Sequence, residues 1–502
     1  MKRNLISGII TCIFSLSVFA QTSQEAFNFS TYGIFGSSRY TAMGGAFGSL
    51  GGDLSAISDN PAAASIFLFP EIGFNYEINT SQTNVNENNR NFSLKNSFSD
   101  LNQFGLVISL KNSEEGPFKR INFAFNINKE QEFQNNLNYL GSSSIGIDQF
   151  FLNNAQGLPL SDLELRSDET ITDLYDFLGL NYGYGDQQAF LGYNAYIIDP
   201  VSSSQNNTSY VSAASYDKVN HDYYLDRFGD HKKYSFTIST QYKNSLYIGV
   251  NLNSHNVNYN ETMDLYESNY SSNSSIEAIR FNNQLISQAS GFSMQIGAIA
   301  KIKDKIRIGV SYDSPTYLNF TEESFQFLQT DHYENEVLVR DIIDPQVSNL
   351  SEYKITTPSK TSFSFGYLIG NKGIFSAQIS TKNYGNIQFE GGQNLYFRML
   401  NEELATTYKN ASMLRLGGEY LIKKVSLRAG YYKENSSLKL GDNSHSGYTF
   451  GLGYDFGGRL LSIAFKSADI NLNHSLANSG IPYNISADQR RNSIMASYNF
   501  KL

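Results

Sequence analysis

The chain has 502 residues, of which 38 are Lys or Arg and 47 are Asp or Glu, so its formal net charge is −9. This acidic balance argues against a nucleic-acid partner, because phosphate backbones are bound by basic surfaces. After residue 20 the sequence contains no apolar run near the length of about 20 residues that a membrane-spanning helix needs.

The first 20 residues have the pattern of a secretory signal. Lys2 and Arg3 precede an apolar run that reaches Phe19, and this order is typical of signal peptides. We therefore assign residues 1–20 to a signal peptide. The single cysteine of the chain, Cys12, lies within it, so the processed protein is expected to hold no disulfide and no Cys-ligated metal.

A glycine-rich segment, AMGGAFGSLGGDLSAISDNPAAASI, occupies residues 42–66. It lacks the strand and helix that flank a dinucleotide-binding glycine motif, and the Gly-Lys-Ser/Thr of a phosphate-binding loop. It also lacks the Gly-x-Ser-x-Gly turn of a hydrolase. The Asn-Pro pair predicts a capped, Ala-rich helix, and the small residues allow backbone to run close to backbone.

From about residue 70 to the C-terminus, apolar and polar residues alternate with a period of two, which is typical of strands with one apolar face. The clearest example covers residues 292–302, where Phe, Met, Ile and Ala alternate with Ser, Gln and Gly. About fourteen such strands can be counted, and the last one reaches Leu502. An even number places both ends of the meander on the same side.

Short and long connections alternate between these strands. Tight turns such as Lys243-Asn244-Ser245 and Lys423-Lys424 are separated by long loops, of which the largest covers residues 131–232. Strict alternation puts every long loop on one side, as in outer-membrane barrels with periplasmic turns and extracellular loops. The alternative is a large soluble β-sandwich or propeller, but such a domain has no need of an apolar face that continues to its final residue.

The predicted fold is therefore all-β, a transmembrane antiparallel β-barrel of about 14 strands over residues 70–502, plugged by an N-terminal hatch over residues 21–69. The lumen of such a barrel is too wide for strand side chains alone to fill, and the glycine-rich segment precedes the first strand. The residues expected to build the hatch are Gly44, Gly45, Gly48, Gly51, Gly52, Asp53, Asn60, Pro61 and Ala62.

The largest loop contains an unusually apolar stretch over residues 171–200. Two interpretations are open: the stretch captures an apolar ligand, or it packs as a lid over the barrel. A second helix-like stretch, residues 394–411, is open to the same two interpretations. The candidate ligand-binding residues are Phe27, Phe29 and Phe35 of the hatch and Phe177, Leu178, Phe190, Leu191 and Tyr193 of the loop.

The sequence contains no pattern that indicates catalysis or metal binding. The six histidines are scattered singly, without a His-x-x-x-His pair, and we find no Ser-His constellation. We therefore predict no catalytic residue, no metal site, no cofactor and no enzymatic activity.

The segment RYTAMGGAFGSLGGDLSAISDNPAAAS, residues 39–65, resembles the hatch of the FadL-type outer-membrane transporters of long-chain fatty acids and other hydrophobic compounds. TPSKTSFSFGYLI (residues 357–369) and LGGEYLI (residues 416–422) are similar to later strands of that family. The resemblance implies passive uptake, capture of the ligand by extracellular loops, and lateral escape through a gap at a kinked early strand. The corresponding stretch here, residues 121–127, has no Gly or Pro.

The predicted function is passive uptake of hydrophobic small molecules, such as long-chain fatty acids, through the outer membrane of a Gram-negative bacterium. The alternative is a FadL-like barrel that serves as a surface component of a protein secretion system. The expected partners are the hydrophobic ligand, outer-membrane lipid, lipopolysaccharide and the barrel-assembly machinery, with the protein acting as a monomer.

Overall fold

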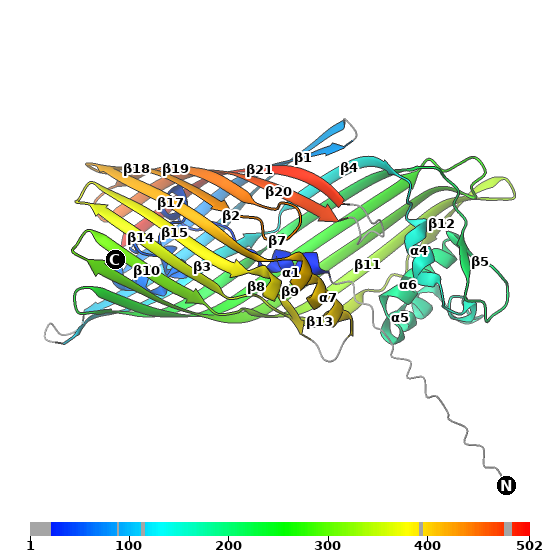
Figure 1. The fold of residues 1–502 in the computed structure, drawn as a ribbon, viewed down its shortest axis with the longest axis horizontal. Coiled ribbons are helices and arrows are strands. Elements are labelled where there is room, and N and C mark those ends of the chain that lie inside the picture. The colour runs from blue at the N-terminus through cyan, green and yellow to red at the C-terminus, as the bar shows by residue number, and fades with distance from the viewer. Residues whose placement is uncertain (1–21, 88–89, 112–115, 391–394, 476–483) are drawn as a thin grey trace, which may run out of the picture.

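A computed structural model describes residues 22–87, 90–111, 116–390, 395–475 and 484–502. Fourteen antiparallel strand positions form the wall of a barrel, which closes where β21 pairs with β1 (Figure 1). The predicted fold class is confirmed. The wall strands are β1 (Glu71–Glu87), β2 (Arg90–Lys111), β3 (Phe118–Glu132), β7 (Val219–Tyr242), β8 (Leu246–Ser268), β9 (Ile276–Ile302), β10 (Ile306–Asp313) in line with β11 (Tyr317–Glu334), β13 (Asn349–Thr356) in line with β14 (Lys360–Ile369), β15 (Gly373–Asn383), β17 (Asn410–Ile422), β18 (Val425–Glu434), β19 (His445–Asp455), β20 (Arg459–Ser475) and β21 (Asn484–Lys501).

Within the described residues, no helix combines the length and the hydropathy that a membrane crossing requires.

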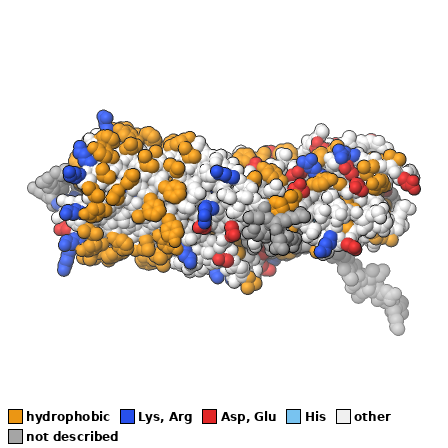
Figure 2. All heavy atoms as spheres, turned by 90° about the horizontal axis from the view of Figure 1, so that it is seen from above, with side chains coloured by type: hydrophobic (Ala, Val, Ile, Leu, Met, Phe, Trp, Pro, Cys, Tyr) orange, Lys and Arg blue, Asp and Glu red, His pale blue; other side chains and the backbone are white. Residues whose placement is uncertain are grey.

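The outer face of the barrel changes from apolar to polar partway along the long strands. On β8, Ile248, Val250 and Leu252 point outward and are exposed, whereas the next outward residues, from Ser254, are polar. The inward face changes in the opposite sense, from Asn253 below to buried Val257 above. Figure 2 shows the visible face of the resulting apolar belt at one end of the barrel. Below this change the wall faces lipid, and above it the wall has the pattern of a soluble protein.

The long strands therefore continue well beyond the membrane. β7 has 24 residues, β8 has 23 and β9 has 27, whereas about 9–11 residues suffice to cross a bilayer. The sequence-based boundary of the largest loop, residues 131–232, was wrong at its C-terminal end, because β7 already begins at Val219. Near Lys232 the outward face of β7 changes from polar to apolar, which marks the edge of the membrane and not the end of the strand.

A helical cap covers the far end of this extension (Figure 1). It is built from α4 (Asp148–Ala155), α5 (Ile171–Asn181) and α6 (Tyr184–Asn194), between β4 (Asn135–Ser143) and β7. The Glu267 carboxylate at the end of β8 accepts the Ile147 N–H over 3.0 Å at the start of α4. The cap is thus fixed to the extended wall by a buried polar contact as well as by its apolar core.

The N-terminal segment fills the barrel as four short helical elements. They are α1 (Ser23–Ser30), α2 (Ser38–Ala42), α3 (Ala56–Asp59) and the 3-10 turn η1 (Pro61–Ile66). The predicted Ala-rich helix is confirmed as η1, with Asn60 as its N-cap and Pro61 in its first position. A further helix, α7 (Leu395–Thr407), lies beside α1 at the mouth of the barrel.

Candidate functional site

The hatch and the barrel wall touch backbone to backbone through glycines on both sides. A Cβ on hatch residue Gly44 would lie 2.8 Å from the Leu416 carbonyl oxygen, and a Cβ on wall residue Gly309 would collide with the Gly48 carbonyl oxygen. On the wall, a Cβ on Gly417 would collide with the Met43 carbonyl oxygen. Side chains at these positions would push the hatch away from the wall, so the glycines allow this close approach.

Polar side chains fasten the hatch to itself. Asp53 accepts hydrogen bonds from the Ser37 hydroxyl at 2.7 Å and from the Ser55 N–H at 2.9 Å. Burial raises the pKa of the Asp53 carboxyl, while Arg39 and the Ser37 hydroxyl oppose that shift. Asp53 therefore joins the entry to α2 with the entry to α3. All nine predicted hatch residues lie inside the barrel, namely Gly44, Gly45, Gly48, Gly51, Gly52, Asp53, Asn60, Pro61 and Ala62.

Asn60 joins two turns of the hatch. Its Nδ2 donates to the Gly48 carbonyl over 2.7 Å, and its Oδ1 accepts the Ala62 N–H over 3.1 Å. We expect Asn60→Ala to destabilise the hatch by about 1–2 kcal/mol, because one cap bond and one buried carbonyl contact are lost. Amide hydrogen exchange across η1 should accelerate, while exchange in the cap helix α6 stays unchanged. Equal exchange in the variant and the native protein would contradict this role for Asn60.

A large cavity lies directly above the hatch. Its volume is about 860 Å³, and it is lined by both apolar and polar side chains. α1 and α7 form one side, where the Phe27 and Tyr408 rings stack at 4.5 Å and the Ser23 hydroxyl donates to Glu403 over 2.7 Å. The other side is formed by the upper ends of β18, β20 and β21 and by the connection after β18.

The predicted ligand-binding residues fall into two groups. Phe27 and Phe35 line the large cavity. Phe29 lies beside it, where its ring packs against those of Phe133, Tyr259 and Phe320. The loop residues instead belong to the helical cap: Leu178, Phe190 and Leu191 are buried in its core, Tyr193 packs against that core, and Phe177 is exposed on its surface. None of these five is among the described residues that line the cavity.

Two cations at the cavity wall were not identified from the sequence. Lys466 donates to the Ile34 carbonyl over 3.0 Å, and its Nζ lies 4.5 Å from the centre of the Phe35 ring. Arg491 Nη2 donates to the Gln134 carbonyl over 3.0 Å. Within the described part of the chain, the Arg491 guanidinium forms no ion pair, and its buried Nε has no hydrogen-bond acceptor. A cation at an inward-facing position of a late strand was the signal that could have revealed them.

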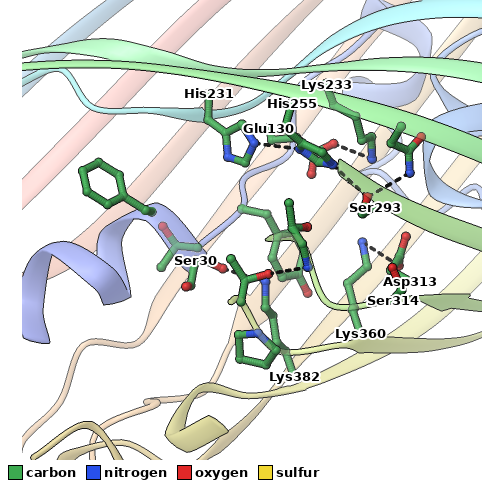
Figure 3. Close-up of a pocket in the computed structure, with 17 residues that line it drawn as sticks. Ser30, Glu130, His231, Lys233, His255, Ser293, Asp313, Ser314, Lys360 and Lys382 are labelled. Carbon is green, nitrogen blue, oxygen red and sulfur yellow. Dashed lines mark hydrogen bonds and ion pairs between the residues drawn. The ribbon is translucent and has the colours of Figure 1, made fainter. Parts of the chain in front are cut away.

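A second, small cavity of about 50 Å³ lies on the other side of hatch residues 29–32 (Figure 3). His231 Nε2 lies 2.8 Å from His255 Nδ1, and His255 Nε2 lies 2.8 Å from Ser293 Oγ. The sequence alone does not reveal this arrangement, because His231, His255 and Ser293 are distant along the chain. The volume of this cavity is far below the range of about 300–1,000 Å³ that is usual for small-molecule sites, so it does not indicate a substrate site beside Ser293.

Charged residues complete the wall of the small cavity. Lys233 pairs with Glu130 at 2.6 Å and Lys360 pairs with Asp313 at 3.2 Å. Lys382 donates to the Ser30 carbonyl of the hatch over 2.7 Å (Figure 3). The hatch is thus held at this level by a polar network contributed by neighbouring wall strands.

Two adjacent wall strands are interrupted at this same level. We name residues 314–316, between β10 and β11, and residues 357–359, between β13 and β14, the proline seam. Pro315 and Pro358 lie at its two interruptions, and proline nitrogen cannot donate to a strand ladder. Thr316 and Thr357 bridge the seam: the Thr357 N–H donates to the Thr316 carbonyl over 2.9 Å, and the Thr316 N–H donates to Thr357 Oγ1 over 3.2 Å. Both threonines line the small cavity.

Comparisons with known proteins support this architecture. A family profile described as BamG matches residues 198–480. No curated protein matches the sequence. The crystal structure of a Pseudomonas aeruginosa FadL homologue is similar with a TM-score of 0.53 and 9% identity, covering 94% of this chain and 99% of that chain. The crystal structure of the Pseudomonas putida toluene transporter TodX is similar with a TM-score of 0.51 and 12% identity, covering 94% of this chain and 100% of that chain.

The structural likeness is one of fold. The apolar belt places the barrel in a membrane, and the alternating short turns and long extensions are those of outer-membrane barrels. Because the BamG profile matches more than half of the chain, the protein belongs to the BamG family and is an outer-membrane β-barrel of the FadL-type fold.

Proposed function

We propose that the protein is a passive channel for hydrophobic small molecules, with long-chain fatty acids as the candidate ligands. The observation that carries this proposal is the cavity of about 860 Å³ directly above the hatch. Its volume lies within the range of about 300–1,000 Å³ that is usual for small-molecule sites. Hatch residues 31–35 and the upper ends of the wall strands line it, so a ligand bound there would lie against the hatch.

The lining of the cavity fits an amphipathic chain. Phe27, Leu400 and Leu438 offer apolar surface, and each methylene buried against such surface contributes about 0.8 kcal/mol. Arg491 and Lys466 lie among the polar lining residues. Arg491, and Lys466 beside its partner Glu77 at 3.5 Å, would donate hydrogen bonds to a ligand carboxylate. The ligand would then lie with its head toward β20 and β21 and its tail toward α1 and α7.

The onward path runs past the hatch to the proline seam. Thr31 and Tyr32 line both cavities, so a shift of this hatch segment would connect them. On the outer surface the seam is flanked by exposed Met294 and Tyr317, which face lipid. We propose that the ligand leaves through the seam into the membrane, and not at an early strand, because β3 pairs with β7 without interruption between its two terminal bulges.

A second candidate function is that of a surface component of a protein secretion or assembly system. β12 (Val337–Ile343) pairs only with β11 among the described strands, and it exposes Val337, Leu338 and Ile342 outside the apolar belt. An exposed apolar edge strand is a template for pairing with another chain. If the protein has this second function, we propose the barrel-assembly machinery as its protein partner, because the chain belongs to the BamG family.

Filling the large cavity tests the channel function. Ala468 is buried at the cavity wall, and we expect Ala468→Trp to lower uptake of labelled long-chain fatty acid by at least about fivefold by occupying ligand space. Ile463→Trp on the same strand is the control, because Ile463 is exposed in the apolar belt. Both variants should keep a heat-modifiable barrel. Native uptake in Ala468→Trp, combined with co-purification of a protein partner, would favour the second function.

A further inference from the structure

Basic side chains gather at the end of the barrel opposite the cap (Figure 2). They lie on the short turns, which are the periplasmic connections of the barrel. Because the whole chain has a net charge of −9, acidic residues outnumber basic ones in the rest of the chain. We name the following exposed residues the basic rim: Lys243, Lys303, Lys305, Lys372, Lys423, Lys424, Arg459 and Lys501.

Three lysines of the basic rim occupy backbone conformations that disfavour them. Lys243, Lys303 and Lys423 have φ angles of 50°, 49° and 55°, which is the left-handed region where Gly and Asn are the preferred residues. The protein does use glycine in its other short turns, at Gly370 and Gly457. Lysine is therefore present at these three positions against the local backbone preference, which indicates a role for its side chain.

The basic rim directly borders the apolar belt. Ile302 precedes Lys303, and Ile422 and Val425 flank Lys423 and Lys424, all of them exposed. Long basic side chains next to an apolar surface extend their charged ends to the level of lipid headgroups. Among the described residues, none of the eight rim side chains forms an ion pair; only Lys301 of the same turns does, with Asp304.

We propose that the basic rim binds the anionic headgroups of phospholipids in the periplasmic leaflet. The rim residues come from the turns β7 to β8, β9 to β10, β14 to β15 and β17 to β18, from the first residue of β20 and from the closing strand β21. These connections are distributed around the circumference of the barrel. A docked acidic protein would contact one sector of such a ring, whereas lipid molecules contact all of it. Positive charge at this depth favours anionic over zwitterionic headgroups.

The test compares lipid retention by the full-length barrel. The rim variant carries Lys303→Asn, Lys305→Asn, Lys423→Asn and Lys424→Asn, because Asn tolerates the left-handed region and should not impair the turns. The matched control carries Lys218→Asn, Lys354→Asn, Lys409→Asn and Lys433→Asn, four exposed lysines outside the rim. Native mass spectrometry is recorded after mixing with equal amounts of phosphatidylglycerol and phosphatidylcholine of identical acyl chains.

The native protein and the control should retain phosphatidylglycerol over phosphatidylcholine by about fivefold or more, and the rim variant should lose this preference. Added salt should reduce the preference in the native protein. Thermal stability of the rim variant should be equal or higher, since strain at two turns is relieved. No preference in the native protein, or an unchanged preference in the rim variant, would overturn the proposal. Loss of an acidic protein partner with lipid preference intact would assign the rim to protein docking instead.

Discussion

Gly417→Val is expected to open the barrel to small polar solutes, whereas Gly418→Val is expected to leave it closed. A Cβ at Gly417 would collide with the Met43 carbonyl oxygen and would lie 2.9 Å from Met43 Cβ. At Gly418 the nearest neighbour is the Ile374 carbonyl oxygen at 3.8 Å, an ordinary contact. The two positions are adjacent on β17, so the two variants carry the same side chain and differ in the face that it occupies.

The expected effect is large because the hatch meets the wall at backbone level there. Overpacking costs about 1–3 kcal/mol when side chains can adjust, and here the obstructing atoms belong to the backbone. A strain of about 2 kcal/mol raises the population of a displaced hatch by more than about tenfold. Influx of a small hydrophilic dye or antibiotic into cells that produce equal amounts of each variant measures this population. Equal influx through both variants would show that the hatch does not seal the lumen at Gly417.

The membrane part of the fold could be predicted from the sequence because lipid imposes one simple requirement. Every second residue of a wall strand must be apolar where the strand faces lipid. Exposed residues such as Phe363 and Phe365 meet this requirement, so the strand can be recognised from the sequence. Above the membrane the apolar residues change from the outer to the inner face. On β8, Leu252 is apolar and points outward, whereas Val257 is apolar and points inward. Without knowledge of where lipid ends, the upper halves of the strands resemble polar loops.

The candidate site was predictable only where its residues are close in sequence. The hatch glycines stand together with the Asn-Pro pair, so they formed a recognisable pattern. Their partners on the wall, such as Gly309 and Gly417, are isolated glycines in separate strands and gain their meaning only from the hatch atoms beside them. Apolar content likewise cannot distinguish a ligand surface from a packed core, and Phe190 and Leu191 belong to a core.

The proline seam is expected to open during transport, and a disulfide across it should stop uptake. Thr316 and Thr357 face each other across the seam and are joined by the 2.9 Å backbone hydrogen bond. The double variant Thr316→Cys and Thr357→Cys would introduce the only thiols outside the predicted signal peptide, since Cys12 is the single cysteine of the chain. Uptake of labelled long-chain fatty acid should fall at least about tenfold on oxidation and recover on reduction, because a covalent bridge holds two strands that must part.

The matched control is Ser362→Cys with Ser380→Cys, whose hydroxyls lie 2.8 Å apart across the uninterrupted pair β14 and β15. This bridge joins strands that already pair continuously at Phe363 and Ile379, so transport should be insensitive to oxidation. If both oxidised proteins transport equally well, the exit lies elsewhere. If both are blocked, the barrel wall must deform as a whole for the ligand to leave, and the interruption at Pro315 and Pro358 is not the specific opening. Only a block confined to the seam supports lateral release at this point, because the control bridge joins strands that already pair without interruption.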